Sequence, residues 1–278
     1  MVNHRPPPPA PRDPVAELLG DHRALLKQVF PLPPKRQSAV TDKTRRRVSL
    51  GCALLALAAT VYWSDPAYQQ ATYQSPAESR QEVFLADGST LMLDRASELR
   101  VTWHLRSRRT ELLHGQAYFS VAHQAWRPFS VSTGVLAVEV LGTSFNLKRD
   151  RDTSEVLVAS GRVAVHAGKE SLELRPGQGL RLDARGERQV KALDPALVGA
   201  WRHGRRVFDQ TPLAEALSEW PASAEPQLKL LGGAGDLQVS GVFDENQRAA
   251  FIALLPQILP LQLRRLPDGS WEAKKIFR

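Results

Sequence analysis

The chain has 278 residues, of which 42% are hydrophobic and 24% charged, a globular composition with room for two domains. Its net charge of +8 is concentrated at one end, because the first 47 residues carry ten Lys or Arg against four Asp or Glu. Basic charge confined to a Pro-rich arm argues against a nucleic-acid-binding face and favours a segment beside a membrane.

The N-terminal arm, residues 1–47, opens with "RPPPPAPRDP", which predicts an extended and disordered start. One amphipathic helix is expected from Asp13 to Phe30, with Pro14 at its first position. Its apolar face consists of Val15, Leu18, Leu19, Leu25 and Leu26. A single helix cannot bury such a face within itself, so the helix either lies on the membrane surface or binds a cytoplasmic partner. We favour the partner.

The run "VSLGCALLALAATVYW", Val48 to Trp63, contains no charged residue and predicts a single transmembrane helix at 48–64. Four basic residues lie within the six positions before it, whereas the next Arg on the other side is Arg80. This asymmetry places the N-terminus in the cytoplasm and the rest of the chain outside. A cleavable export signal is the alternative, because "ALAAT", residues 56–60, has small residues at the required spacing and "TRRRVS", residues 44–49, loosely matches a twin-arginine signal.

Residues 65–80 are polar and without pattern, so they are expected to be a linker. From Gln81 the hydrophobic period becomes two, and short strands alternate with turn sequences such as "ADGS", "HG", "TG", "SG" and "PG". Residues 81–200 are therefore predicted to form an all-β sandwich or roll.

Residues 201–278 contain a weak repeat, since "VFDQTPLAEALSEW" begins at Val207 and "VFDENQRAAFIALL" begins at Val242. Each copy predicts a strand and a helix, and Thr211 is a candidate cap for the first helix. Further strands are expected at 228–231, 261–265 and 271–276, which gives a small α+β domain of two βαβ units. The expected fold class is mainly β, with a disordered or helical arm and one transmembrane helix before these two domains.

The stretch "VEVLGTSFNLK" places Gly142-Thr143 inside an apolar alternation. It lacks the second glycine of a G-x-S-x-G elbow, and a β-bulge or tight bend is its structural interpretation. Cys52 is the single cysteine and the seven histidines are scattered, so neither an intrachain disulfide, a metal nor a cofactor is expected. No pattern predicts an enzyme acting on another molecule.

Six segments, taken in order, resemble the FecR family of transmembrane sensors and anti-sigma factors: "LADGSTLMLDRASELRV", "LLHGQAYFSVA", "RPFSVST", "VEVLGTSFNLK", "ASGRVAVHA" and "LRPGQGLRLD". The segment "AWRHGRRVFDQTPLAEALSEW" extends the likeness into a part similar to the short N-terminal domain of secretins and TonB-dependent receptors.

This resemblance implies an inner-membrane signal transducer with its C-terminal domains in the periplasm. Its implied partners are an extracytoplasmic-function sigma factor and the N-terminal signalling domain of a TonB-dependent outer-membrane receptor, in siderophore or haem uptake. Family members usually carry a longer cytoplasmic region of several helices, so a membrane-anchored periplasmic interaction module without sigma binding is the alternative.

The resemblance also implies self-cleavage between Gly142 and Thr143, with the Thr143 hydroxyl as nucleophile and Gly142 supplying the carbonyl.

Overall fold

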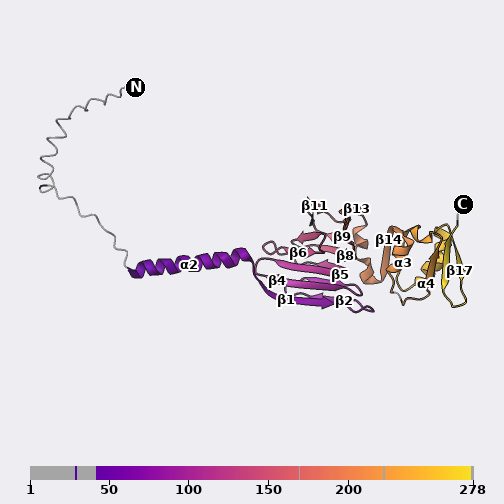
Figure 1. Cartoon of the computed structure of the whole chain (residues 1–278), viewed down its shortest axis with the longest axis horizontal. Coiled ribbons are helices and arrows are strands. Elements are labelled where there is room, and N and C mark those ends of the chain that lie inside the picture. The colour runs from indigo at the N-terminus through magenta and orange to yellow at the C-terminus, as the bar shows by residue number, and fades with distance from the viewer. Residues whose placement is uncertain (1–28, 30–41, 169, 222, 277–278) are drawn as a thin grey trace, which may run out of the picture. The chain divides into compact units, whose positions relative to one another are not determined.

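The computed structural model describes residues 29, 42–168, 170–221 and 223–276 of the chain (Figure 1). The chain divides into two compact units, residues 1–58 and 59–278. The predicted partner-binding residues Val15, Leu18, Leu19, Leu25 and Leu26 lie outside the described residues.

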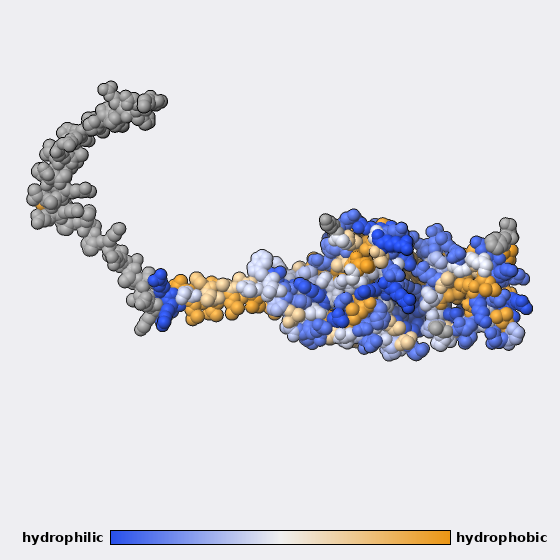
Figure 2. Space-filling view, in the orientation of Figure 1, coloured by the Kyte–Doolittle hydropathy of each residue, from blue (hydrophilic) through white to orange (hydrophobic). Residues whose placement is uncertain are grey.

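Helix α2, Asp42–Ser64, contains the apolar run and extends past the predicted start by six residues. Its part from Arg45 to Ser64 is long and apolar enough to cross a membrane, and all of these side chains are exposed. Figure 2 shows the apolar stretch as an orange band along the helix. The expectation of one apolar helix near the N-terminus is thus confirmed among the described residues.

The strands that follow form two sheets joined through one long strand, β5 (Arg108–Ser120). The first sheet has the order β1-β4-β5-β6-β7-β10-β11, and the second has the order β2-β3-β5-β8-β9-β12-β13. The bounds of the other strands are β1 Ala67–Gln74, β2 Gln81–Phe84, β3 Thr90–Leu93, β4 Glu98–His104, β6 Phe129–Ser132, β7 Ala137–Val140, β8 Ser144–Arg149, β9 Thr153–Ser160, β10 Val163–Ala167, β11 Glu170–Leu174, β12 Gln178–Asp183 and β13 Arg188–Ala192. We call these thirteen strands the β sandwich.

The core of the β sandwich is made by alternate side chains that both sheets turn inward. Phe119 of β5 stacks on Phe145 of β8 with ring centroids 4.8 Å apart, and it meets Phe129 of β6 edge-on at 6.2 Å. These three rings are fully buried between the sheets. The predicted mainly β fold is confirmed.

Strand β5 corrects the prediction of two strands separated by a turn at "HG". The chain passes from the first sheet into the second at Gly115, whose φ is +87°. A Cβ on Gly115 would lie 2.3 Å from Ser97 Oγ, so glycine is needed both for φ and for space. The strand bends here without breaking its pairing.

The segment 65–80, expected to be a linker, contains strand β1. Its residues pair with β4 in antiparallel register, from Ala67 opposite His104 to Gln74 opposite Glu98. β1 lies at the edge of the first sheet and its side chains are mostly exposed, except that Tyr73 packs against the core. An edge strand with no fully buried side chain lacks the apolar alternation from which strands are predicted.

Residues 205–276 form a second hydrophobic core, which we call the C-terminal module. Its elements are β14 Arg205–Pro212, α3 Leu213–Ser218, β15 Leu228–Leu231, β16 Gln238–Asp244, α4 Arg248–Ile258, β17 Leu261–Arg265 and β18 Trp271–Lys275. The predicted repeat pairs with itself, since Val207 of β14 lies opposite Val242 of β16. Three 3-10 turns, Pro195–Leu197, Ala200–His203 and Ala234–Asp236, lie in the connections.

The predicted cap of the first helix in this module is wrong. Pro212 takes the N-cap position of α3 and makes no side-chain cap hydrogen bond. Thr211 belongs to β14 instead, and its hydroxyl accepts a hydrogen bond from Asp209 N at 3.2 Å. Pairing with β16 therefore continues up to the first residue of the helix.

Candidate functional site

Gly142 and Thr143 lie where the chain passes from one sheet to the other. β7 ends at Val140 in the first sheet, and β8 begins at Ser144 in the second. The three residues between them run beside the loop that follows β5. Val121 N donates to Thr143 O at 2.9 Å, and Gln124 N donates to Leu141 O at 2.8 Å. The interrupted strand of the sequence is therefore a crossing between sheets.

Glycine is required at position 142 because the crossing leaves no space for a side chain. Its φ lies outside the left-handed region, but a Cβ would lie 2.6 Å from the Cβ of His123 and 2.7 Å from its Nδ1. Gly161, at the return crossing from β9 to β10, packs on the same bond. A Cβ there would lie 2.6 Å from Thr143 Cγ2 and 3.1 Å from the Gly142 carbonyl oxygen. Both crossings thus enclose the Gly142–Thr143 peptide bond.

The Thr143 side chain is 6% exposed, and its hydroxyl has no hydrogen-bond partner among the described residues. A buried hydroxyl without a partner costs about 1–3 kcal/mol and is rare in folded proteins. The hydroxyl belongs to the residue after the Gly142 carbonyl, the pairing that an N-to-O acyl shift requires. Cleavage between Gly142 and Thr143 stays a prediction.

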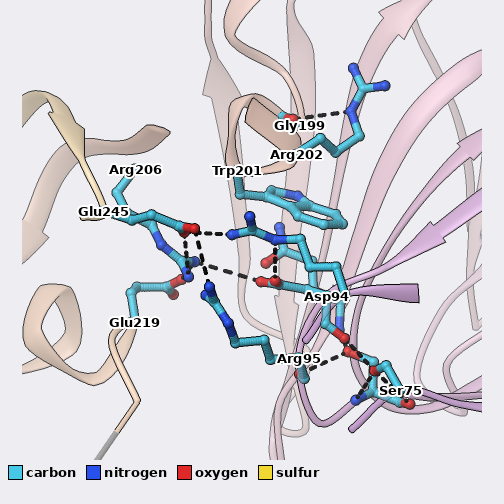
Figure 3. Close-up of polar contacts among 12 residues, drawn as sticks. Ser75, Asp94, Arg95, Gly199, Trp201, Arg202, Arg206, Glu219 and Glu245 are labelled. Atoms are coloured by element: carbon cyan, nitrogen blue, oxygen red, sulfur yellow. Dashed lines mark hydrogen bonds and ion pairs between the residues drawn. The ribbon is translucent and has the colours of Figure 1, made fainter. Parts of the chain in front are cut away.

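A cluster of charged side chains joins the β sandwich to the C-terminal module (Figure 3). We call it the polar junction; its members are Arg80, Asp94, Arg95, Arg206, Glu219 and Glu245. Glu245 accepts from Arg80 at 2.5 Å and from Arg95 at 3.2 Å, and Arg206 Nη2 lies 3.2 Å from it. Lys148 of β8 also pairs with Glu219. The positive charges of the three arginines in the junction equal the negative charges of its three carboxylates.

Both glutamates of the polar junction are held ionised. Burial raises the pKa of Glu245, but hydrogen bonds from Arg80 and Arg95 outweigh it, and the pKa lies below its ordinary value. Burial likewise raises the pKa of Glu219, and the charges of Lys148 and Arg206 lower it further than burial raises it. Charged groups withdrawn from water in this way are stable only while their partners stay in place.

The polar junction lies at the opposite end of the β sandwich from the Gly142–Thr143 crossing. Register places Ser120 opposite Ser144 at one end of the β5–β8 pair and Gly115 opposite Arg149 at the other. Asp94 N donates to Gln116 O at 2.8 Å, which fixes the junction beside Gly115. The connection between sandwich and module packs on the outer face of the second sheet, where Trp201 Nε1 donates to Asn146 Oδ1 at 2.8 Å.

Sequence reasoning did not find the polar junction. Arg80 and Glu245 are 165 positions apart, and Arg80 belongs to no motif. One difference between the two copies of the repeat pointed to the junction: the second copy has Glu245 where the first copy has Gln210. Among the described residues, no group of three or more His, Cys, Asp or Glu side chains is arranged to hold a metal ion.

Comparison with known proteins agrees with the family resemblance. The family model described as FecR protein matches residues 71–164, roughly a third of the chain. Two crystal structures, each of a candidate anti-sigma factor from Parabacteroides distasonis, have the same fold. One has a TM-score of 0.65 and 22% identity, covering 75% of this chain and 100% of its own. The other has a TM-score of 0.64 and 23% identity, covering 74% and 100%.

No curated protein matches the chain. The share of the chain that the two crystal structures cover is more than twice that of the family model, so the shared fold extends beyond the matched residues. The matched residues include β2 to β9, the bend at Gly115 and the Gly142–Thr143 crossing. Residues 71–164 thus match the FecR protein family model, and the resemblance to that family drawn from the sequence is confirmed.

Proposed function

We propose that the chain is a single-pass inner-membrane signal transducer that regulates an extracytoplasmic-function sigma factor. The observation that carries the proposal is the order of its parts: a helix long and apolar enough to span a membrane ends six residues before the FecR match begins. Arg45, Arg46 and Arg47 precede the apolar run, which favours a cytoplasmic N-terminus and periplasmic strands. The similarity of the fold to that of candidate anti-sigma factors supports this function.

The sigma factor binds the apolar face of the predicted helix 13–30. A co-purification experiment with the full chain and its sigma factor in detergent tests this contact. The variant Leu18→Glu/Leu25→Glu places two charges on the apolar face and is expected to abolish retention, whereas Arg23→Glu, on the polar face, is expected to preserve it. If wild-type chain retains no sigma factor, the chain is a membrane-anchored periplasmic interaction module instead.

The periplasmic signal comes from the N-terminal domain of a TonB-dependent receptor of siderophore or haem uptake, which binds the C-terminal module. In the described residues one edge of β16 is paired with β14 and the other carries no strand. An apolar groove between β16 and α4 is lined by Val242, Phe243, Phe251 and Leu254, among others, and Val242 is 45% exposed. A strand added to β16 gains backbone hydrogen bonds and places alternate side chains in this groove.

Pull-down with the receptor's signalling domain tests the docking. Val242→Arg introduces a charge into the groove and is expected to abolish binding. Val190→Arg, on the exposed edge strand β13, is the matched control and is expected to bind like the wild type. Equal binding by both variants would assign the receptor contact to another surface.

The chain also cleaves itself between Gly142 and Thr143, and it has no activity on other molecules. The Thr143 oxygen attacks the Gly142 carbonyl carbon, the C–N bond breaks, and the Thr143 nitrogen takes the hydroxyl proton. Water then hydrolyses the resulting ester to a Gly142 carboxylate and restores the hydroxyl. The unpartnered Thr143 hydroxyl supports this second function.

Denaturing electrophoresis of the purified chain tests self-cleavage. Two fragments are expected from the wild type and one full-length band from Thr143→Ala. Thr143→Ser keeps a hydroxyl nucleophile and is expected to restore the fragments. A single band in the wild type, identical to that of Thr143→Ala, would show that the bond is intact.

A further inference from the structure

The turn between β4 and β5 is fixed to the first residue after α2. Asp65 Oδ1 accepts from Arg106 N at 2.7 Å, and Asp65 Oδ2 accepts from Ser107 Oγ at 2.6 Å. The Asp65 carbonyl oxygen lies 2.7 Å from His104 Nδ1. Asp65 is buried by these contacts and has a φ of +43°. The tip of the turn, Leu105, is thereby held within a few residues of the point where the helix ends.

A second loop, residues 121–128, lies beside this turn. Arg127 Nη2 donates to His104 O at 2.8 Å. β6 runs parallel to β5 with Phe129 opposite Arg108, so the residues before Phe129 lie beyond the end of the sheet at which Asp65 is bound. The fully buried Arg108 fixes the loop from beneath, donating to Arg127 O at 3.0 Å and to Asp87 at 2.5 Å.

The two tips are apolar and exposed although the backbone around them is held in place. Trp126 is 94% exposed and Leu105 is 51% exposed, and Trp63, at the end of the helix, is 77% exposed. Neither 104–109 nor 121–128 contains an Asp or Glu, and the first segment adds the exposed Arg109. Aromatic and aliphatic tips among guanidinium groups are the composition of a protein surface at a membrane interface.

We propose that this end of the β sandwich lies against the lipid headgroups, with Leu105 and Trp126 at the level of the glycerol backbone and Arg106, Arg109 and Arg127 on headgroup phosphates. The proposal rests on membrane anchoring by α2 and goes beyond it, because an anchor alone leaves the sandwich free to move away from the bilayer. The charge and the position of this surface both favour lipid as its partner. The surface is basic, and it adjoins the end of the only described helix that can span a membrane. Arginine binds phosphate through several N–H groups at once.

Site-specific labelling of the full chain in lipid nanodiscs that contain anionic lipid tests the proposal. Cys52 is the single cysteine, so a Cys52→Ser background accepts one environment-sensitive fluorophore at Leu105→Cys, Trp126→Cys or Val190→Cys. The Val190 position on β13 is 68% exposed and serves as the control. Fluorophores at 105 and 126 are expected to shift to the blue and to lose intensity when shallow spin-labelled lipid is included. The fluorophore at 190 is expected to do neither.

A label on native Cys52 separates this proposal from the anchor itself. Quenching of that label by spin-labelled lipid places α2 in the bilayer, and absence of quenching refutes the anchor. If Cys52 is quenched while 105 and 126 behave like 190, the sandwich does not touch the membrane and the proposal is wrong. Protection of 126 from aqueous iodide without quenching by lipid would also overturn it, because a protein partner would then cover the tip.

Discussion

At the crossing between the two sheets, the backbone of Leu141–Thr143 runs so close to the loop after β5 that the His123 side chain occupies the position of a Cβ on residue 142. The sequence indicated a β-bulge or a tight bend at this glycine. The reason found is the absence of a side chain, which no local pattern reveals. Thr143 was singled out for its hydroxyl, and its methyl group packs against Gly161, eighteen positions away.

Gly142→Ala is expected to destabilise the β sandwich by about 1–3 kcal/mol, because a methyl group forced into a filled space displaces its neighbours. Urea unfolding of the detergent-solubilised chain, followed by tryptophan fluorescence, measures the loss. Gly51→Ala is the matched control, since nothing lies within 4 Å of a Cβ built on Gly51. Equal stability of the two variants would mean that the crossing has room for a side chain.

Among the elements, the strands expected at 228–231 and 261–265 have the same bounds as β15 and β17. β5 was split in two because His114-Gly115 has the composition of a turn, and β1 was missed because it buries few side chains. The C-terminal repeat was found because both copies begin with Val-Phe-Asp, and the phenylalanine of each, Phe208 and Phe243, packs in the second core. The polar junction connects segments that are far apart in the sequence, so spacing along the sequence carries no sign of it.

Glu245→Ala is expected to lower the free energy of unfolding by about 2–4 kcal/mol, because three arginines lose a shared, nearly buried carboxylate. The control is Glu111→Ala, which removes a half-exposed ion pair with Arg100 and is expected to cost ~1 kcal/mol or less. Both variants are compared by urea unfolding at pH 7. A cost for Glu245→Ala no larger than that for Glu111→Ala would show that the junction adds no stability.

The contribution of Glu245 also depends on pH. Its folded-state pKa lies below the ordinary value of 4.5, so the unfolded chain binds the proton more readily. The stabilisation is therefore complete above that value and is lost as pH falls through the lower, folded-state pKa. We expect the stability difference between wild type and Glu245→Gln to shrink in this acidic range and to stay constant above pH 6. A difference that persists unchanged at the most acidic pH would contradict the assignment.

For the whole molecule, the mainly β fold and the resemblance to the FecR family could be predicted from the sequence. The placement of the Gly142–Thr143 crossing and the polar junction at opposite ends of the β sandwich could not. Asp65 and the Gly142–Thr143 crossing are at one end, and the polar junction is at the other. That division arises from β5, which begins at one end, bends at Gly115 at the other and returns. Local sequence predicts the strands but not which end of the sandwich each turn occupies.

Because strands on either side of the crossing pair with each other, two separate chains of residues 1–142 and 143–278 are expected to assemble when expressed together. β5 and β7 come from the first chain, and their partners β8 and β10 come from the second. Co-elution in size-exclusion chromatography in detergent measures assembly. Replacing Phe145 by Asp in the second chain removes a core contact and is expected to prevent it. Separate elution of the unaltered chains would show that the 142–143 bond is needed for folding.

The antiparallel pairing of β5 with β8 has a mechanical consequence. Its hydrogen bonds lie perpendicular to the strands, and the pair runs from the end that holds Asp65 to the end that holds the polar junction. A pull between these two ends acts along the strands, so it loads all of the bonds together in shear instead of opening them one after another. A chain cut between Gly142 and Thr143 would therefore still carry tension from the C-terminal module to the residue that follows the helix.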